Sequence, residues 1–242
     1  MNITTIIQAR MGSSRLPGKV LRLLKDRSVL GHVITRSKTI PSVSNVVVAT
    51  SNLERDDAIA TEAEKYGVFC YRGSENNVLS RYYEAAKLAK AEVIIRVTSD
   101  CPLLDPATTE KLIQEFVSGG YDYARVKLAN SYPRGLDSEI LTFAALEQAY
   151  EQAETDYDKE HVTPFIYRHP EIFHIHTMVN EKDESQYRLT LDTPEDWELI
   201  LRIYNHLYKG TVFGWDETLE LLKMHPEWVR INANVEQAHS GE

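Results

Sequence analysis

The stretch "IIQARMGSSRLPGKVL", residues 6–21, joins a short apolar run to a loop that is rich in positive charge. The run stops at Ala9, and Arg10, Arg15 and Lys19 then follow among two glycines and two serines. Glycine lets the backbone approach a ligand closely and adopt positive φ, and successive N–H groups in such a loop attract anions. Arginine can also fork across two phosphate oxygens. The stretch therefore predicts a strand that ends in a phosphate-binding loop.

The positive charge of this loop contrasts with the rest of the chain. The 242 residues carry a net charge of −9, yet residues 1–27 hold six Lys or Arg against a single Asp. A basic loop on an acidic chain suits a small anion, whereas general binding of nucleic acid needs a basic surface. The composition therefore predicts a small anionic ligand and no nucleic-acid partner.

Hydrophobic patterns along the first 120 residues alternate between those of strands and those of helices. We expect strands at 3–8, 45–50, 68–71 and 92–98, and helices at 29–39, 55–66, 77–90 and 106–117. This alternation is typical of a mostly parallel sheet that is covered by helices. The remaining chain predicts strands at 121–126, 139–141, 172–178 and 187–191, and helices at 143–153, 159–167, 194–208 and 216–223.

Two aspartates follow predicted strands. Asp100 stands two residues after the run "EVIIRVT" (92–98), and Asp192 follows the predicted strand 187–191. A carboxylate at the carboxyl end of a strand points into the crevice where open α/β sheets bind ligands. Mg²⁺ takes a few carboxylate oxygens together with phosphate oxygens and water. Either aspartate could instead be a turn or cap residue. For Asp192 this alternative arises because Thr193 and Pro194 begin a predicted helix directly after it.

The opening stretch closely resembles the phosphate-binding signature of the sugar cytidylyltransferases, A-R-x-G-S-x-R-L-P-G-K. This family includes the CMP-3-deoxy-manno-octulosonate and CMP-acylneuraminate synthetases, and its SpsF-type branch of spore-coat polysaccharide biosynthesis is the most similar. The resemblance extends over nearly the whole chain, through "RGSENNVLSRYYEAA" (72–86), "VTSDCPLLDP" (97–106), "YPRGLDSEI" (132–140), "EHVTPFIY" (160–167) and "LDTPEDWELI" (191–200). It implies a Rossmann-like nucleotidyltransferase fold with helices on both faces of the sheet, CTP as donor and Mg²⁺ as cofactor.

The resemblance also implies roles for residues. Catalysis is expected from Arg15, Lys19, Asp100 and Asp192, and the two aspartates are expected to hold the metal. The nucleotide is expected to contact Ala9, Arg10, Gly12, Ser13, Ser14, Arg15, Lys19, Arg72 and Gly73.

For the acceptor we expect contacts from Tyr132, Arg134, Asp137, Glu139, Glu160 and Arg188. Carboxylates suit sugar hydroxyls, and arginine suits a sugar carboxylate or phosphate. Polar decoration of a hairpin would explain Arg134 equally well, and Arg188 could support Asp192 instead of reaching a phosphate. Arg81 could be a surface residue that pairs with Glu75 or Glu84.

These expectations together predict Mg²⁺-dependent transfer of CMP from CTP to a sugar acid or sugar phosphate, with release of pyrophosphate, in surface polysaccharide biosynthesis. A glycosyltransferase that uses a nucleotide sugar, or a non-catalytic protein that binds one, is the alternative. Two cysteines without a C-x-x-C pair fit a reducing cytosol. The N-terminal apolar run is too short for a signal or a membrane span, so we expect a cytoplasmic protein with no membrane partner.

We expect one nucleotidyltransferase domain over residues 1–242, in which 121–180 form a smaller β-containing subregion for the acceptor and for dimerisation. This segment is rich in Tyr and Phe, and aromatic residues are favoured in the cores of interfaces. The resemblance implies a homodimer, whose contact we place at residues 174–178 or their neighbours. From Val235 onward we expect a frayed tail.

Overall fold

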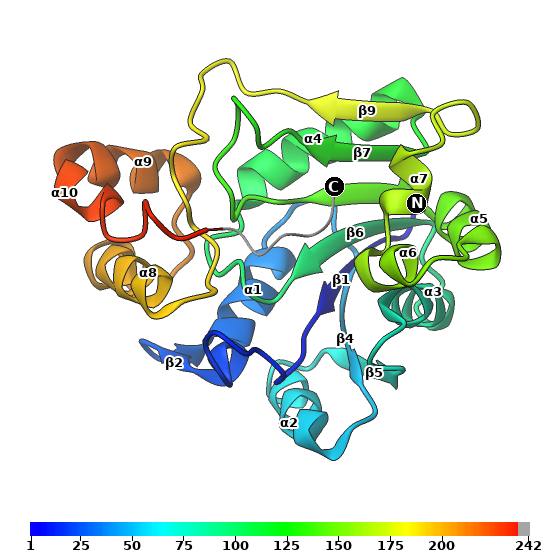
Figure 1. Cartoon of the computed structure of the whole chain (residues 1–242), viewed down its shortest axis with the longest axis horizontal. Helices are drawn as coiled ribbons and strands as arrows, with labels where there is room; N and C mark the ends of the chain where they lie inside the picture. The colour runs from blue at the N-terminus through cyan, green and yellow to red at the C-terminus, as the bar shows by residue number, and fades with distance from the viewer. Residues whose placement is uncertain (237–242) are drawn as a thin grey trace.

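A seven-stranded sheet runs through the computed structural model, which describes residues 1–236 (Figure 1). In spatial order its strands are β5 (Phe69–Gly73), β4 (Asn45–Ser51), β1 (Ile3–Gln8), β6 (Val93–Thr98), β8 (Glu139–Thr142), β7 (Tyr123–Val126) and β9 (Ile175–Met178). Of these seven, β8 is antiparallel to both of its neighbours, and the other pairings are parallel. The predicted, mostly parallel sheet is confirmed, and the strands of residues 121–180 extend it instead of forming a separate layer.

Helices cover both faces of this sheet. One face packs on α1 (Val29–Lys38), α2 (Asp57–Lys65) and α4 (Pro106–Gly119), and the other packs on α3 (Val78–Leu88), α5 (Phe143–Gln152), α6 (Asp156–His161) and α7 (Pro164–Tyr167). The helices α8 (Pro194–Leu207), α9 (Trp215–Met224) and α10 (Pro226–Val229) gather beside α1, where the parallel strands end (Figure 1). Short elements complete the chain: η1 (Lys19–Leu21), η2 (Glu54–Asp56), β2 (Leu23–Leu24) and β3 (Arg27–Ser28).

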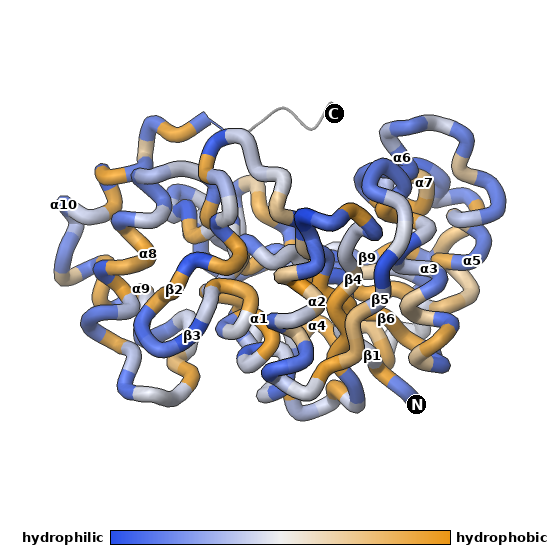
Figure 2. Tube along the Cα trace, turned by 90° about the horizontal axis from the view of Figure 1, so that it is seen from below, coloured by the Kyte–Doolittle hydropathy of each residue, from blue (hydrophilic) through white to orange (hydrophobic). Residues whose placement is uncertain are grey.

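The side chains of the strands alternate between two hydrophobic cores. Ile7 on β1 is buried in the core toward α1 and α4, whereas its neighbour Ile6 is buried in the core toward α3 and α5. Strands buried on both faces need continuous apolar runs such as those of β4 and β6. Figure 2 shows these apolar strands as a band between more hydrophilic outer segments. Helices therefore shield both faces and leave the ends of the strands for polar chemistry.

Side chains cap the starts of α4 and α8. Asp105 caps α4 by accepting a hydrogen bond of 2.8 Å from the N–H of Thr108. Thr193 caps α8, and Asp196 Oδ2 in turn accepts a hydrogen bond from the N–H of Thr193 at 3.1 Å. Such a capping box satisfies two backbone donors that a helix start would leave without partners.

Two predicted elements are wrong. Residues 187–191 form an extended connection and no strand, because the N–H of Leu189 bonds to Arg134 O at 2.7 Å whereas that of Leu191 bonds to Asp100 O at 2.8 Å. The segment thus pairs with two different parts of the chain in turn. The helix expected over 159–167 is divided into α6 and α7 at Val162, whose φ is 74°. Positive φ does not continue a right-handed helix.

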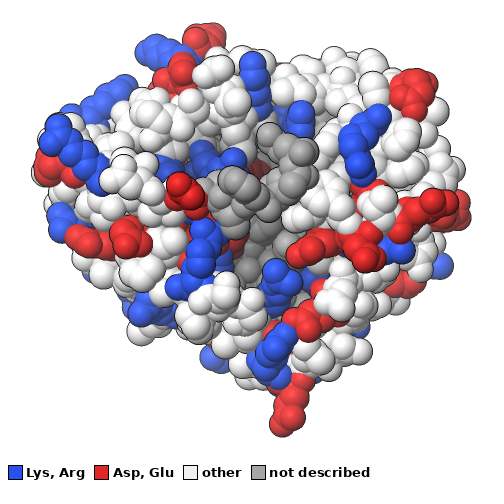
Figure 3. Space-filling model, in the orientation of Figure 1, with Lys and Arg blue, Asp and Glu red and all other residues white. Residues whose placement is uncertain are grey.

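Charged side chains of both signs lie on one face of the molecule (Figure 3). Figure 3 shows Lys and Arg side chains mixed with Asp and Glu side chains over the face that it draws. Within residues 1–236, none of the helices combines the length and the apolar character that a membrane span requires.

Candidate active site

A cavity of about 320 Å³ opens where β1 and β6 end. Seven of the nine residues expected to contact a nucleotide line it: Ala9, Arg10, Gly12, Ser13, Ser14, Arg15 and Lys19. Asp100 and Asp192 line it as well. The structure thus brings the basic loop and both aspartates to one place, as the sequence predicts.

Local contacts shape the loop that follows β1. The N–H of Met11 donates to Asp56 Oδ1 at 2.8 Å, and that of Leu16 donates to Ser13 Oγ at 3.3 Å. Gly18 has a left-handed conformation with φ of 69° directly before η1, a conformation that glycine adopts without steric cost. The loop consequently turns back, and Lys19 extends into the cavity. Asp56, which is fully buried, went unnoticed in the sequence because it lies 45 residues from its partner.

The ammonium of Lys19 lies between the two aspartates. Its Nζ donates to Asp100 Oδ2 at 2.9 Å, to Asp192 Oδ1 at 2.7 Å and to the carbonyl oxygen of Leu191 at 2.7 Å. Since one nitrogen contacts both carboxylates, these lie within reach of a single cation. The expectation that Asp100 and Asp192 meet is borne out, although Asp192 arrives on the irregular connection 187–192 and not on a strand.

The contact between Lys19 and Asp100 favours the charged form of both groups. Burial alone lowers the pKa of the Lys19 ammonium, but the attraction of Asp100 and then of Asp192 outweighs burial and raises that pKa above its usual value. Burial likewise raises the pKa of the Asp100 carboxyl, and Lys19 outweighs it, so that this pKa lies below its usual range. At neutral pH Lys19 is therefore an ammonium and Asp100 a carboxylate.

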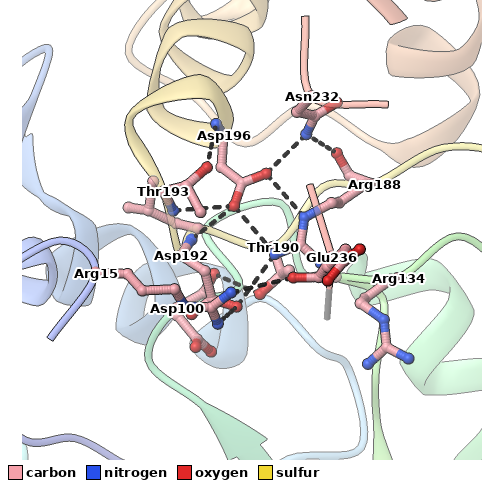
Figure 4. A network of polar contacts seen from close by, with 12 residues as sticks. Arg15, Asp100, Arg134, Arg188, Thr190, Asp192, Thr193, Asp196, Asn232 and Glu236 are labelled. Atoms are coloured by element: carbon pink, nitrogen blue, oxygen red, sulfur yellow. Dashed lines mark hydrogen bonds and ion pairs between the residues drawn. The ribbon is translucent and has the colours of Figure 1, made fainter. Parts of the chain in front are cut away.

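Two arginines complete the surroundings of Asp192 (Figure 4). Its Oδ2 accepts from Arg15 Nη2 at 3.0 Å and from Arg188 Nη2 at 3.2 Å. Arg15 also donates to the carbonyl oxygen of Glu236 at 3.2 Å. Arg188, expected at the acceptor, thus contacts Asp192, which agrees with the alternative of a supporting role.

A glycine fixes the position of the connection that carries Asp192. Gly135 has φ of 107°, and a Cβ built on it would lie 2.5 Å from the carbonyl carbon of Leu189 and 2.7 Å from the nitrogen of Thr190. Real Cβ atoms do not come so close to backbone atoms. The "YPRGLD" segment therefore acts as a close backbone support for residues 187–192, a role that its polar residues did not suggest.

We expect Gly135→Ala to lower both the melting temperature and the activity, because the new methyl group would push residues 189–190 and displace Asp192. Gly67→Ala is the matched control, since Gly67 also has positive φ (62°) but has open space around its Cβ position. Left-handed strain alone costs about 1–2 kcal/mol in either variant. Equal losses of melting temperature and of turnover in the two variants would contradict this role of Gly135.

The structure does not bring Arg72 and Gly73 to the cavity. Arg72 instead donates to Ser51 O at 3.1 Å and to Leu53 O at 2.9 Å, and it pairs with Asp57 at 2.6 Å. Arg81, for which a surface ion pair is one interpretation of the sequence, is buried and lines the cavity. It donates to the carbonyl oxygens of residues 74 and 75 and so secures the loop that precedes α3.

Of the residues expected at the acceptor, Glu160 lines the cavity. Tyr132 is buried, and Arg134 pairs with Asp137 at 3.9 Å. Burial raises the pKa of the Asp137 carboxyl to about 6. His161, which the sequence offers beside Glu160 as a possible acceptor residue, lines the cavity as well. The cavity wall also contains residues that went unnoticed: Gln8, Val20, Val78, Arg96, Thr98 and Ser99.

Glu139 belongs to a buried network beside the cavity. Its carboxylate accepts from Arg96, Tyr123 and Thr163. Burial raises the pKa of Glu139, but Arg96 in particular outweighs burial and the pKa is lowered. Arg96 reaches Gln8 Oε1 at 3.2 Å, so Glu139 orients an arginine of the cavity wall. Arg96 and Glu139 are opposite each other in the β6–β8 register.

The position of the Lys19 ammonium shows which cation chemistry the site suits. Two carboxylates and one carbonyl oxygen surround this point, and Mg²⁺ binds such oxygens together with phosphates and water. Across residues 1–236, no group of three or more His, Cys, Asp or Glu side chains could hold a metal. A divalent ion held by Asp100 and Asp192 would thus need further oxygen ligands from a bound phosphate or from water.

Comparison with known proteins places the chain in a family. A family model described as cytidylyltransferase matches residues 4–221. SpsF of Bacillus subtilis, a spore coat polysaccharide biosynthesis protein, is 36% identical over 233 residues, which span 93% of this chain and 96% of SpsF.

Solved structures agree with this placement. A cytidylyltransferase from Leptospira borgpetersenii has a TM-score of 0.90 at 34% identity, and the match covers 99% of this chain and 100% of that one. The fold is also that of a CMP:2-keto-3-deoxy-manno-octonic acid synthetase solved with CTP, with a TM-score of 0.67 at 19% identity over 85% of this chain and 99% of that one. On the family match, the SpsF identity and the shared fold, the chain belongs to the cytidylyltransferases, a family of nucleotidyltransferases.

Proposed function

We propose that the protein transfers CMP from CTP to a sugar acid or sugar phosphate and releases pyrophosphate, and that it does so in surface polysaccharide biosynthesis. The observation that carries this proposal is the contact of Lys19 with both Asp100 and Asp192 beside the basic loop. A cation shared by two carboxylates at the end of a phosphate-binding loop supports charge neutralisation at a reacting phosphate. The polysaccharide context comes from the similarity to SpsF.

In this proposal the basic loop holds the β- and γ-phosphates, with Arg15 and Lys19 as its main charges. Both side chains now contact Asp192, so a triphosphate would compete with this carboxylate for them. Asp100 and Asp192 would hold Mg²⁺, which supplies Lewis-acid neutralisation of the α-phosphate. An acceptor oxygen then attacks the α-phosphorus in line, the bond to the bridging oxygen breaks, and pyrophosphate leaves toward the basic loop.

The reaction itself is tested by supplying substrates. The protein is incubated with each nucleoside triphosphate, Mg²⁺ and a panel of sugar acids and sugar phosphates, and pyrophosphate is measured. We expect release with CTP and one class of acceptor. Pyrophosphate release with another nucleotide and none with CTP would contradict the choice of base. Release of a nucleoside diphosphate or monophosphate from a nucleotide sugar would favour the glycosyltransferase alternative.

We further propose a cytoplasmic homodimer whose contact includes β9. In residues 1–236, β9 pairs with β7 and ends the sheet, and the flanking residues Ile172 and Val179 are about half exposed. An unpaired strand edge invites pairing. We expect roughly 800 Å² or more to be buried per subunit. Light scattering that detects a 27.7 kDa species alone at micromolar concentration would contradict the dimer.

A further inference from the structure

Asp192 lacks the support that a strand gives to Asp100. It lies on an irregular connection, and its carboxylate is nevertheless aimed at Lys19 with 2.7 Å between Oδ1 and Nζ. The residues that pack against this connection therefore determine the position of the Asp192 carboxylate. Gly135 supports the connection from one side, and Asp196 of α8 supports its end.

The carboxylate of Asp196 is fully buried and accepts hydrogen bonds from four residues (Figure 4). Its Oδ2 accepts from the N–H groups of Asp192 at 2.9 Å and of Thr193 at 3.1 Å, and from Arg188 Nη2 at 3.1 Å. Its Oδ1 accepts from Arg188 Nε at 2.9 Å and from Asn232 Nδ2 at 2.8 Å. A capping box needs only the bond to Thr193, so most of these contacts have another purpose.

Arg188 connects Asp196 with the carboxylate of Asp192. Its Nη2 lies 3.1 Å from Asp196 Oδ2 and 3.2 Å from Asp192 Oδ2. One oxygen of Asp192 is thereby held toward Arg188 and Arg15, which leaves the other oxygen toward Lys19 and Asp100. Asp196 thus fixes both the backbone of Asp192, through its N–H, and the rotation of its side chain, through Arg188.

The same carboxylate attaches the C-terminal part of the described chain to the site. Asn232 is buried, and its amide donates to Asp196 Oδ1 at 2.8 Å and to Arg188 O at 2.9 Å. Four residues further on, the carbonyl oxygen of Glu236 accepts from Arg15. The hydrogen bond between Asn232 and Asp196 and the one between Glu236 and Arg15 together place residues 232–236 beside the basic loop.

We propose that Asp196 is a positioning residue of the transfer site: with Arg188 and Asn232 it holds Asp192 in the orientation that a divalent ion requires. This inference rests on the proposed function, because it takes Asp192 as a ligand of the metal. Outer partners that orient a metal ligand typically change metal affinity about 10–100-fold when they are replaced. Asp196 itself would touch neither nucleotide nor metal.

The test is Asp196→Asn. The amide has nearly the shape of the carboxylate, but its NH₂ group is a donor and would face N–H groups that now donate to an oxygen of Asp196. Mn²⁺ binding in the presence of CTP is followed by the electron paramagnetic resonance signal of free Mn²⁺, and CTP binding without divalent ions is measured by calorimetry. We expect roughly 10–100-fold weaker Mn²⁺ binding, with unchanged binding of metal-free CTP. The control is Glu217→Gln, which replaces an exposed carboxylate that accepts a hydrogen bond from the N–H of Gly214 at the start of α9. Glu217 does not line the cavity, so both affinities should stay unchanged.

Wild-type Mn²⁺ affinity in Asp196→Asn would overturn the positioning role, whatever its melting temperature. If this variant does not fold, Asn232→Ala decides, because it removes one donor to Asp196: weakened Mn²⁺ binding supports the proposal and unchanged binding overturns it. A wild-type protein that binds neither CTP nor Mn²⁺ with CTP would instead refute the proposed function, so the two failures are distinguishable.

Discussion

Replacing Lys19 by methionine is expected to lower turnover roughly 10²-fold or more, the scale of losing one preorganised charge donor. Methionine nearly keeps the length of the side chain and removes its charge. In the proposed reaction this charge neutralises the leaving pyrophosphate, and no other residue contacts both Asp100 and Asp192 among the ion pairs of residues 1–236. Steady-state release of pyrophosphate from CTP measures the effect.

The same substitution is also expected to lower the melting temperature in the absence of divalent ions. It leaves two carboxylates facing each other without the ammonium between them, and removing one partner of a buried ion pair destabilises a protein strongly. Added Mg²⁺ should restore part of the loss. The sequence alone places Lys19 in a loop and predicts no change in the melting temperature when it is replaced. The structure shows Lys19 buried, and a loss of stability is therefore expected instead.

Lys111→Met is the control for both measurements, because Lys111 is exposed on α4. It should leave turnover and melting temperature unchanged. Full turnover in Lys19→Met would refute the assignment of Lys19 to the leaving phosphates. A fully stable Lys19→Met protein would contradict the pairing with the two aspartates.

Asp100→Asn is expected to reduce metal-dependent turnover by a similar factor, roughly 10²-fold or more. The substitution removes one of the two carboxylates that Lys19 contacts and that would hold a divalent ion, and Mg²⁺ depends on such charged oxygens. The fold should persist, because an amide oxygen can still accept the hydrogen bond from Lys19. The measurement is turnover as a function of Mg²⁺ concentration, with half-saturation displaced to higher concentration.

The matched control is Asp183→Asn, which changes an exposed turn residue bonded to Ser185. It should not alter the dependence on Mg²⁺. An Asp100→Asn enzyme with the Mg²⁺ dependence of the wild type would show that the metal is held elsewhere.

The basic loop and Asp100 could be predicted because they depend on local patterns, whereas residues 187–191 before Asp192 form no strand. A strand, a glycine-containing turn and a charged residue follow each other in sequence, and the carboxyl ends of parallel strands meet at one edge of a sheet. The position of Lys19 between Asp100 and Asp192 could not be predicted in this way. It requires residues 187–192 to lie beside Asp100, and that contact depends on the support by Gly135 and Asp196.

Arg72 and Arg96 show why other residues were misplaced or missed. Arg72 lies within β5, one residue beyond the strand expected over 68–71, and its side chain bonds to the backbone of residues 51–53. Arg96 looks like part of a buried apolar run, and its partner Glu139 becomes evident only once β8 lies antiparallel to β6. Which side chains pair across strands is a consequence of register, and register joins residues that are far apart in the chain.

The proposed function requires the loop after β1 and Lys19 to hold the triphosphate of CTP beside the two aspartates. Calorimetric titration of CTP in the presence of Mg²⁺ tests this directly, because it needs no knowledge of the acceptor. We expect wild-type protein and Lys111→Met to bind CTP alike, CMP to bind far more weakly, and Lys19→Met to lose most of its affinity for CTP. Equal affinity of the wild type and of Lys19→Met for CTP, or equal affinity of the wild type for CTP and CMP, would contradict the claim.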